Sequence, residues 1–365
     1  MKKISFCGLL CAFFTAMVCS LIACNNSDKK QEQTKHSIVA TIYPEYAWTK
    51  EILGTRADSV ELTLLMKNGV DLHSYKPTAQ DIAKIASADM VVYVGGESDE
   101  WIKDALEATP KKGRSEINLM EALGDRVKAE EVVEGMQAEE TKDERRETKE
   151  VDSDHHEEHA EKHEHHHDHE ENAEEHEHHH HHEEEVENDE HVWLSLKNAE
   201  ILVQKIAAEL AKMDSTHAQF YTENAKDYIT KINALDNEYR ATVNSAAQKT
   251  VLFGDRFPFR YLVDDYGLKY YAAFVGCSAE SEASFETIAF LAGKMDSLSL
   301  PAIFTIEKGN QKIARAVLDA SKKSKEAQIL ILNSMQSVTE QQINEGMDYL
   351  SIMKSNLDVL KNALK

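Results

Sequence analysis

The fold is decided by SIVATIYPEYAWTKEILGTRADSVELTLL, residues 37–65, in which β-rich and helical runs alternate. The run at 37–42 predicts a strand, 45–53 a helix and 59–65 a second strand. Strands separated by helices of about ten residues indicate βαβ units and a parallel sheet. The same alternation predicts a helix at 78–87, a strand at 90–94 and a helix at 99–108.

A second series of strands and helices follows two long helical patterns. The long patterns cover residues 196–213 and 215–247, and the second has apolar residues at nearly 3.6-residue spacing. We therefore predict an α/β fold of two lobes, each with a small parallel sheet flanked by helices, joined by one long rigid helix. The later strands are expected at 250–253, 269–273, 302–306 and 328–332, and the later helices at 256–266, 284–297, 311–323 and 339–364.

Composition shifts divide the chain further. The expected parts are a signal peptide at 1–23, a linker at 24–36, an N-terminal lobe at 37–127 completed by 189–214, a charged loop at 128–188, the linking helix at 215–248 and a C-terminal lobe at 249–365. The core must hold the lobes without disulfides, because Cys277 is the only cysteine after residue 24.

Fourteen of the eighteen histidines lie in the charged loop, among Glu and Asp. Residues 150–190 carry a net charge of −18 out of −24 for the whole chain, which points to a cation partner and away from nucleic acid. Imidazole and carboxylate are ligands of zinc, copper and nickel, so we expect a disordered loop that binds metal; the alternative is a merely solvating linker. The histidines are His155, His156, His159, His163, His165, His166, His167, His169, His176, His178, His179, His180, His181 and His182.

Two windows of this tract, beginning at His163 and His176, match the metalloprotease motif H-E-x-x-H. The motif requires an amphipathic helix that holds both histidines, and these windows contain no apolar residue. We interpret both matches as products of the biased composition.

The N-terminus has the layout of a secretory signal. Lys2 and Lys3 precede an apolar stretch that ends in Leu21-Ile22-Ala23-Cys24, which resembles a bacterial lipobox. We therefore expect lipidation of Cys24 and an exported, periplasmic or cell-surface protein held at a membrane. The alternative is a transmembrane anchor, because about 20 apolar residues span a bilayer.

Two sequence blocks resemble the metal-specific substrate-binding proteins of bacterial ABC importers, the zinc and manganese group. Residues 70–78, VDLHSYKPT, match a His-x-Tyr-x-Pro block, and residues 189–195, DEHVWLS, match Asp-x-His-x-Trp-Leu-Ser. The resemblance covers the chain from Ile38 onward apart from the charged insertion, and a His-rich insertion before the second block is typical of the zinc branch. The resemblance implies that His73 and His191 are metal ligands. The alternatives are that His73 is a surface-turn residue and that His191 caps the following helix.

The remaining ligands depart from the family pattern. The resemblance places a third ligand, usually His, within residues 253–259, where Asp255 is the candidate. The alternative role for Asp255 is that of an N-cap for the next helix. At the fourth ligand position, where the family has Asp, this chain has Asn333. An amide oxygen is a weak zinc ligand, so water or Glu307 is the alternative fourth ligand. Glu307 is otherwise expected to brace its loop.

The resemblance implies capture of one divalent ion, zinc rather than manganese, by a monomer that delivers it to an ABC permease and its ATPase subunit. No catalysis is expected. The open alternatives are a manganese-binding protein, a metal-buffering or adhesive surface lipoprotein, and a zinc metallohydrolase, since two His and a carboxylate also form catalytic sites.

Overall fold

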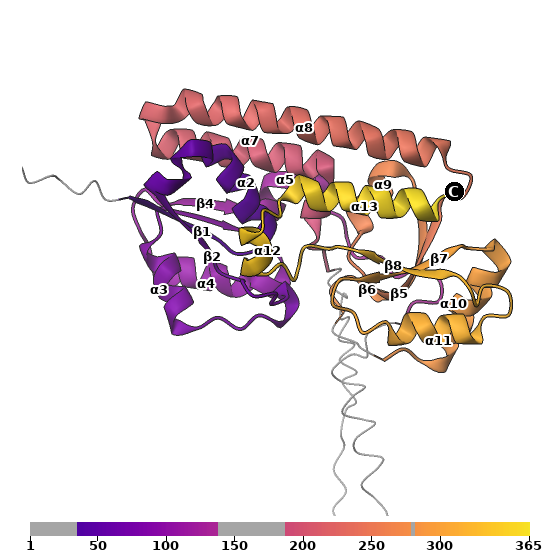
Figure 1. Cartoon of the computed structure of the whole chain (residues 1–365). Coiled ribbons are helices and arrows are strands. Elements are labelled where there is room, and N and C mark those ends of the chain that lie inside the picture. The colour runs from indigo at the N-terminus through magenta and orange to yellow at the C-terminus, as the bar shows by residue number, and fades with distance from the viewer. Residues whose placement is uncertain (1–34, 138–186, 279–281) are drawn as a thin grey trace, which may run out of the picture. The chain divides into compact units, whose positions relative to one another are not determined.

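Each half of the chain folds around a parallel sheet of four strands (Figure 1). The computed structural model describes residues 35–137, 187–278 and 282–365, and the residues from His36 onward form one compact unit. The first sheet contains β1 (His36–Ala40), β2 (Val60–Leu64), β3 (Met90–Tyr93) and β4 (Ser115–Asn118), in the order β2-β1-β3-β4. The second contains β5 (Thr250–Phe257), β6 (Lys269–Val275), β7 (Ala302–Ile306) and β8 (Gln328–Leu332), in the order β6-β5-β7-β8.

Helices flank both sheets. The first lobe contains α2 (Tyr43–Leu53), α3 (Ala79–Ser87), α4 (Glu100–Ala108) and α5 (Leu119–Leu123). Two long helices follow, α7 (Leu196–Met213) and α8 (Ala218–Ser245). The second lobe contains α9 (Arg260–Tyr266), α10 (Phe285–Leu298), α11 (Lys312–Ala320), α12 (Glu340–Asn344) and α13 (Tyr349–Ala363). This arrangement confirms the predicted fold class of two α/β lobes and one long helix.

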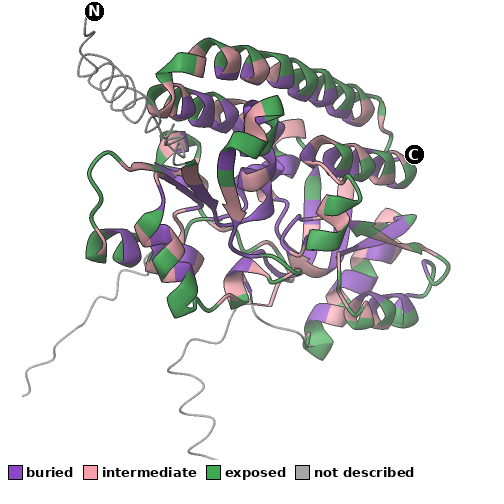
Figure 2. Ribbon diagram, turned by 60° about the vertical axis from the view of Figure 1, so that its left-hand side comes forward, coloured by how far each residue is buried: buried purple, intermediate pink, exposed green. Residues whose placement is uncertain are grey.

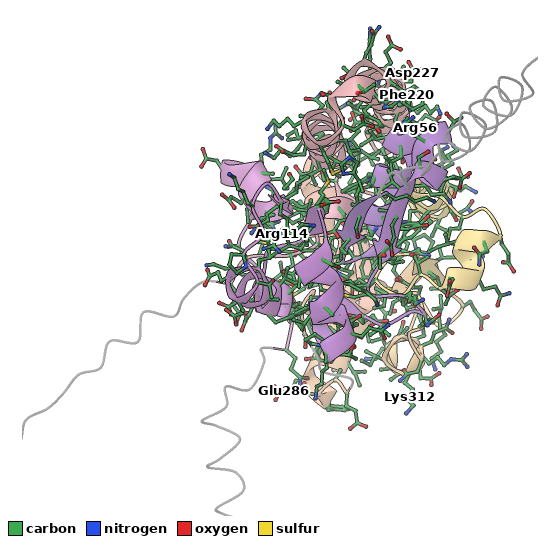
Figure 3. The ribbon with its side chains drawn as sticks, turned by 90° about the vertical axis from the view of Figure 1, so that its left-hand side faces the viewer. Arg56, Arg114, Phe220, Asp227, Glu286 and Lys312 are labelled. Carbon is green, nitrogen blue, oxygen red and sulfur yellow. The ribbon has the colours of Figure 1, made fainter. Side chains whose placement is uncertain are left out.

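Helix α8 is fixed to both lobes. At its start, Arg56 of the first lobe donates a hydrogen bond to the Tyr221 hydroxyl at 3.3 Å, and Figure 3 shows Arg56 and Phe220 in the same region. Towards its end, the Tyr239 hydroxyl donates to the Met353 carbonyl of α13 at 2.5 Å. Because α8 is a continuous helix of 28 residues with anchors at both ends, it holds the lobes at a defined spacing.

The apolar core runs from one lobe into the other, as the buried residues in Figure 2 show. Trp193 is completely buried, and its indole N–H donates to the Ser334 carbonyl of the second lobe at 2.8 Å. Trp48 of α2 contacts Tyr349 of α13 edge to face, with ring centroids 5.1 Å apart. Each large apolar side chain buried here contributes about 1.5–3 kcal/mol, so the contact between the lobes is substantial.

Several elements differ from the sequence-based expectation. Strand β5 continues to Phe257 through a register shift, and α9 starts only at Arg260, because Pro258 disfavours helix in the residue before it. The helix expected at 339–364 is broken between α12 and α13, where Gly346 has a φ of 94° and the Asp348 side chain caps the second helix. Strand β4 and helix α5 were not predicted.

The helices of the described residues include none with the length and apolar character needed to cross a membrane. The expected signal peptide, the linker to residue 34, Cys24 and the histidine-rich tract lie outside the described residues.

Candidate metal centre

His73 lies in a short 3₁₀ turn, Leu72–Ser74, that follows the first βαβ unit. The turn forms because the Asp71 side chain accepts a hydrogen bond from the His73 backbone N–H at 3.0 Å. The ring is 8% exposed, and its Nδ1 lies 2.7 Å from the Ser98 hydroxyl and 3.5 Å from a Glu190 oxygen. These contacts at Nδ1 leave Nε2 as the ring atom available to a ligand.

His191 lies between Asn188, which pairs with Ala129 in an antiparallel bridge, and the 3₁₀ turn at Val192–Leu194. One oxygen of Asp189 accepts the His191 backbone N–H at 2.8 Å and lies 2.9 Å from Nδ1 of the ring. Burial raises the pKa of Asp189 to about 7, and above that pH its carboxylate holds the ring proton on Nδ1 and leaves the Nε2 lone pair free. A carboxylate in this role is typical of metal-binding histidines.

The two imidazoles meet with their Nε2 atoms 3.1 Å apart. The pKa of each imidazole is lowered to about 3, mainly by burial. His191 and Arg256 add to this effect at His73, Arg256 adds to it at His191, and Asp71 opposes it at both. Both rings are therefore neutral near pH 7, the form that binds metal. Two nitrogens on a tetrahedral zinc at about 2.0–2.1 Å would be about 3.3 Å apart, so the pair has the spacing of two zinc ligands.

Cys277 is the third potential ligand at this position. Among the described residues, one group of His, Cys, Asp or Glu side chains is close enough to share a metal ion. It consists of His73, His191 and Cys277, whose ligand atoms lie within 4.8 Å of one another. The backbone packs closely here, because a Cβ on Gly276 would lie 2.8 Å from the Phe257 carbonyl. Burial, then the charge of Glu130, raises the pKa of the thiol, so it is protonated when no metal is bound.

Asp255 lies within β5 and bonds to the backbone instead of joining this cluster. Its two oxygens accept the backbone N–H groups of Arg256 at 2.9 Å and of Ile306 at 3.2 Å, the second across the sheet in β7. Asp255 is therefore not a helix cap, and the structure gives it a bracing role between neighbouring strands. Its predicted role as a ligand stays a prediction.

Glu307 and Asn333 order the loop after β8. Glu307 accepts hydrogen bonds from the backbone and hydroxyl of Ser334 at 2.7 and 2.8 Å, and from the Gln336 backbone at 3.1 Å. The Asn333 side chain accepts the Met335 backbone N–H at 2.8 Å. The structure therefore supports the bracing interpretation of Glu307 and places neither side chain in the histidine–cysteine cluster.

Arg256 brings a positive charge close to the imidazole pair. Its guanidinium donates to the Asp71 carboxylate of the first lobe and, at 3.1 Å, to the Gln336 amide oxygen of the second. The Gln336 side-chain nitrogen is buried without a hydrogen-bond partner. Any cation bound at the histidines must therefore be compensated by nearby negative charge.

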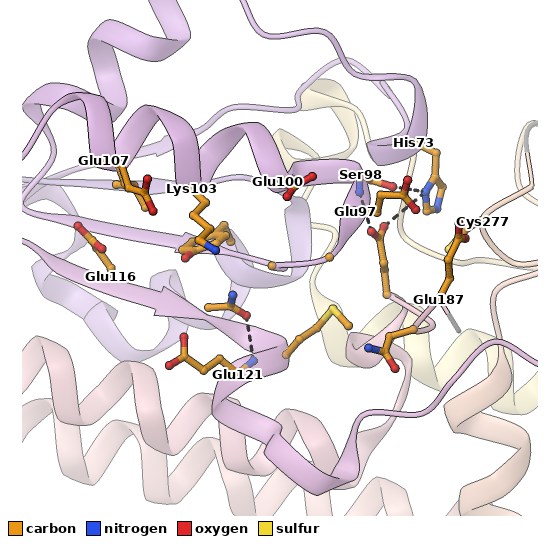
Figure 4. Close-up of a pocket in the computed structure, with 18 of the residues that line it drawn as sticks. His73, Glu97, Ser98, Glu100, Lys103, Glu107, Glu116, Glu121, Glu187 and Cys277 are labelled. Atoms are coloured by element: carbon orange, nitrogen blue, oxygen red, sulfur yellow. Dashed lines mark hydrogen bonds and ion pairs between the residues drawn. The ribbon is translucent and has the colours of Figure 1, made fainter. Parts of the chain in front are cut away.

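A cavity of about 1220 Å³ leads to the cluster. Figure 4 shows His73 and Cys277 at one end and Glu107 and Glu116 at the other. Its charged lining is predominantly acidic, which attracts cations. The acidic residues are Glu97, Glu100, Glu107, Glu116, Glu121, Glu130, Glu187 and Glu190, against the basic Lys103, Lys111 and Arg114.

The sequence analysis missed Cys277, Arg256 and Gln336 as parts of the site. A signal for Cys277 existed: ligands in parallel sheets gather at the carboxyl ends of strands, and Cys277 follows the end of β6 by two residues. The expected strand ended at residue 273, which placed Cys277 in a loop away from the edge. The roles of Arg256 and Gln336 depend on the contact between the lobes, which has no local signal.

Two parallel α/β lobes with a buried imidazole pair where they meet define a two-lobed binding protein. A family model described as zinc-uptake complex component A, periplasmic, matches residues 38–363. The chain belongs to this family.

The relatives have consistent descriptions. Zinc-binding lipoprotein AdcA of Streptococcus pneumoniae serotype 4 is 32% identical over 99% of this chain, which spans only 61% of that protein. High-affinity zinc uptake system protein ZnuA of Bacillus subtilis is 30% identical over 96% of both chains. The crystal structure of the Zn(II)-bound ZnuA-like domain of S. pneumoniae AdcA has a TM-score of 0.62 and 26% identity, over 90% of this chain and 99% of that one.

Proposed function

We propose that this protein captures zinc at His73 and His191 and delivers it to an ABC-type permease that works with an ATPase subunit. The observation that carries the proposal is the buried imidazole pair, with Nε2 atoms 3.1 Å apart and Nδ1 atoms in contact with Ser98 and Asp189. Membership of a zinc-uptake family and the names of the relatives support it. Capture and release need no reaction, so the protein is not an enzyme.

The nature of the ligands favours zinc over manganese. Imidazole nitrogen suits zinc, whereas manganese is bound best by carboxylate, carbonyl and water oxygen. The carboxylates of Asp189 and Glu190 contact the Nδ1 atoms of the two imidazoles, so the Nε2 atoms face the ion. Zinc also binds more tightly than manganese in the general affinity order of divalent metals.

The parts outside the described residues complete the proposal. Lipid on Cys24 would hold an exported monomer at a membrane surface. The histidines between His155 and His182 would bind additional zinc weakly and raise its concentration beside the cleft, because a short tether gives an effective concentration of about millimolar.

The zinc site is tested by chelator competition on the full chain, which separates a tight site from weak binding by the tract. We expect His73→Ala and His191→Ala each to remove the tight site. His36→Ala and His217→Ala are matched controls, because these histidines also lie outside the tract but face Asp89 and Asp214 away from the cluster. Unchanged tight binding in both cluster variants would exclude the proposed site.

Delivery is tested separately from binding. A strain that lacks this protein but retains its permease should regain growth in zinc-limited medium with the wild-type chain and not with His191→Ala. Failure of the wild-type chain to restore growth would favour a buffering or adhesive role over import, and equal rescue by both chains would exclude His191 from the delivery site.

A further inference from the structure

The metal cluster joins three segments that are distant in the sequence. His73 comes from the turn after β2, His191 from the segment before α7, and Cys277 from the turn after β6. Their ligand atoms lie within 4.8 Å of one another, although nothing in the sequence pairs them. A shared ligand accounts for this convergence of three unrelated segments.

We propose that the Cys277 thiolate is the third ligand of the zinc site, which makes it a His₂Cys site. This inference rests on the proposed function. Zinc binds sulfur at about 2.3 Å and imidazole nitrogen at about 2.0–2.1 Å, which requires nitrogen–sulfur distances of about 3.6 Å. A movement of about 1 Å by the Cys277 side chain or its turn satisfies this requirement.

The acidic candidates near the cluster are engaged elsewhere. Asp255 accepts two backbone hydrogen bonds within its sheet, and Glu307 holds the loop after β8. Asp189 supports the His191 ring from behind. Among the described side chains, Cys277 is the one that combines an ionisable ligand atom with proximity to both imidazoles.

The charges around the cluster call for an anionic ligand. Imidazole binds metal as a neutral ligand, and the Arg256 guanidinium, which contacts Asp71 and Gln336, adds a positive charge that opposes a dication. A thiolate bound to the metal offsets part of this electrostatic repulsion. One oxygen of the buried Glu190 side chain has no hydrogen-bond partner and lies 3.5 Å from Nδ1 of His73. A buried carboxyl oxygen without a hydrogen bond indicates that positive charge belongs beside this histidine.

Binding exchanges a proton for the metal. The Cys277 S–H bond breaks, its electron pair forms the sulfur–zinc bond, and the proton leaves to solvent. No oxidant or reductant takes part. The bound protein therefore keeps a metal-stabilised thiolate.

Cobalt(II) absorption of the reduced full chain tests the ligand directly, because cysteine thiolate on cobalt gives an intense near-ultraviolet charge-transfer band that imidazole and carboxylate do not give. We expect this band in the wild type and its loss in Cys277→Ser. Zinc affinity at the tight site should fall at least about tenfold in Cys277→Ser, the order found when a metal's coordination is disturbed. Cys277→His should restore affinity to within a few-fold of wild type while still lacking the band.

Controls separate this inference from the proposed function. Thermal unfolding of the metal-free variants should match the wild type, and Asp255→Asn should keep the band. A tight site that survives unchanged in Cys277→Ser but disappears in His191→Ala would overturn the Cys277 assignment and leave the proposed function standing. A band that persists in Cys277→Ser would assign it to the cysteines before residue 25 and also count against the proposal. A tight site unaffected by His73→Ala and His191→Ala would overturn the proposed function itself.

Discussion

Asp189 fixes the orientation of the His191 ring, so its replacement measures how much zinc affinity depends on that support. One Asp189 oxygen accepts both the backbone N–H of His191 at 2.8 Å and the ring Nδ1–H at 2.9 Å. Asp189→Asn keeps an oxygen acceptor and removes the charge, whereas Asp189→Ala removes the acceptor as well. The two variants therefore separate the contribution of charge from that of geometry.

The expected effects follow from the hydrogen bond to the ring. A hydrogen bond to a charged group contributes about 1.5–3 kcal/mol and a neutral one about 0.5–1.5 kcal/mol, so the Asn variant should lose about 1–1.5 kcal/mol. That loss weakens zinc binding about five- to tenfold. The Ala variant leaves a buried N–H without an acceptor and frees the ring to rotate, so binding should weaken by about ten- to a hundredfold.

Chelator competition at about pH 8, above the pKa of about 7 to which burial raises Asp189, measures this ranking. The matched control is Asp214→Asn, because Asp214 also contacts a histidine Nδ1, that of His217, at 2.8 Å, but lies in the turn between α7 and α8. The control should leave the tight site unchanged. Equal zinc affinities for wild type and Asp189→Ala, with both folded, would refute the argument that this carboxylate orients a ligand.

Three further predictions concern stability and the tract. Trp193→Phe should destabilise the protein by about 1–3 kcal/mol in chemical denaturation, because the Ser334 carbonyl loses its buried donor; no change would refute the role of this bond. Burial raises the pKa of Asp99 to about 7, so its contribution to stability is present below its unfolded pKa near 4 and is lost as pH rises through 7. The stability advantage of wild type over Asp99→Asn should therefore shrink by roughly 2–3 kcal/mol from pH 5 to pH 8, and an advantage that does not change with pH would contradict the burial argument. Deletion of residues 150–185 should leave one tight zinc site and remove weaker ones; calorimetry that finds no tight site would place the function in the tract.

The fold could be predicted from sequence because its signals are local. The strands expected at 302–306 and 328–332 have the same bounds as β7 and β8, since each is a short β-rich run between helical patterns. The expectation lost accuracy where local signals conflict, as at Pro258 after β5. The single helix expected at 339–364 covers both α12 and α13, because the apolar spacing continues across the break at Gly346.

The site could be predicted only in part, because its ligands have unequal sequence signals. His73 and His191 lie in sequence blocks that resemble family motifs, and in the structure Asp71 and Asp189 of these blocks accept the backbone N–H groups of the two histidines. Cys277 has no comparable block, and its position depends on the length of β6 and on the packing of the second lobe against His191. For Asp255, sequence position alone could not show that both oxygens bond to the backbone.

Asp71 connects the orientation of His73 to the contact between the lobes. One of its oxygens accepts the His73 backbone N–H, and the other accepts the Arg256 guanidinium of the second lobe. The ligand cluster likewise takes His73 from the first lobe and Cys277 from the second. Separation of the lobes would break the Asp71–Arg256 contact and move Cys277 away from His73 in the same step. A zinc ion held by all three ligands is therefore expected to stabilise the closed arrangement, and opening is expected to leave it with fewer ligands, ready for transfer.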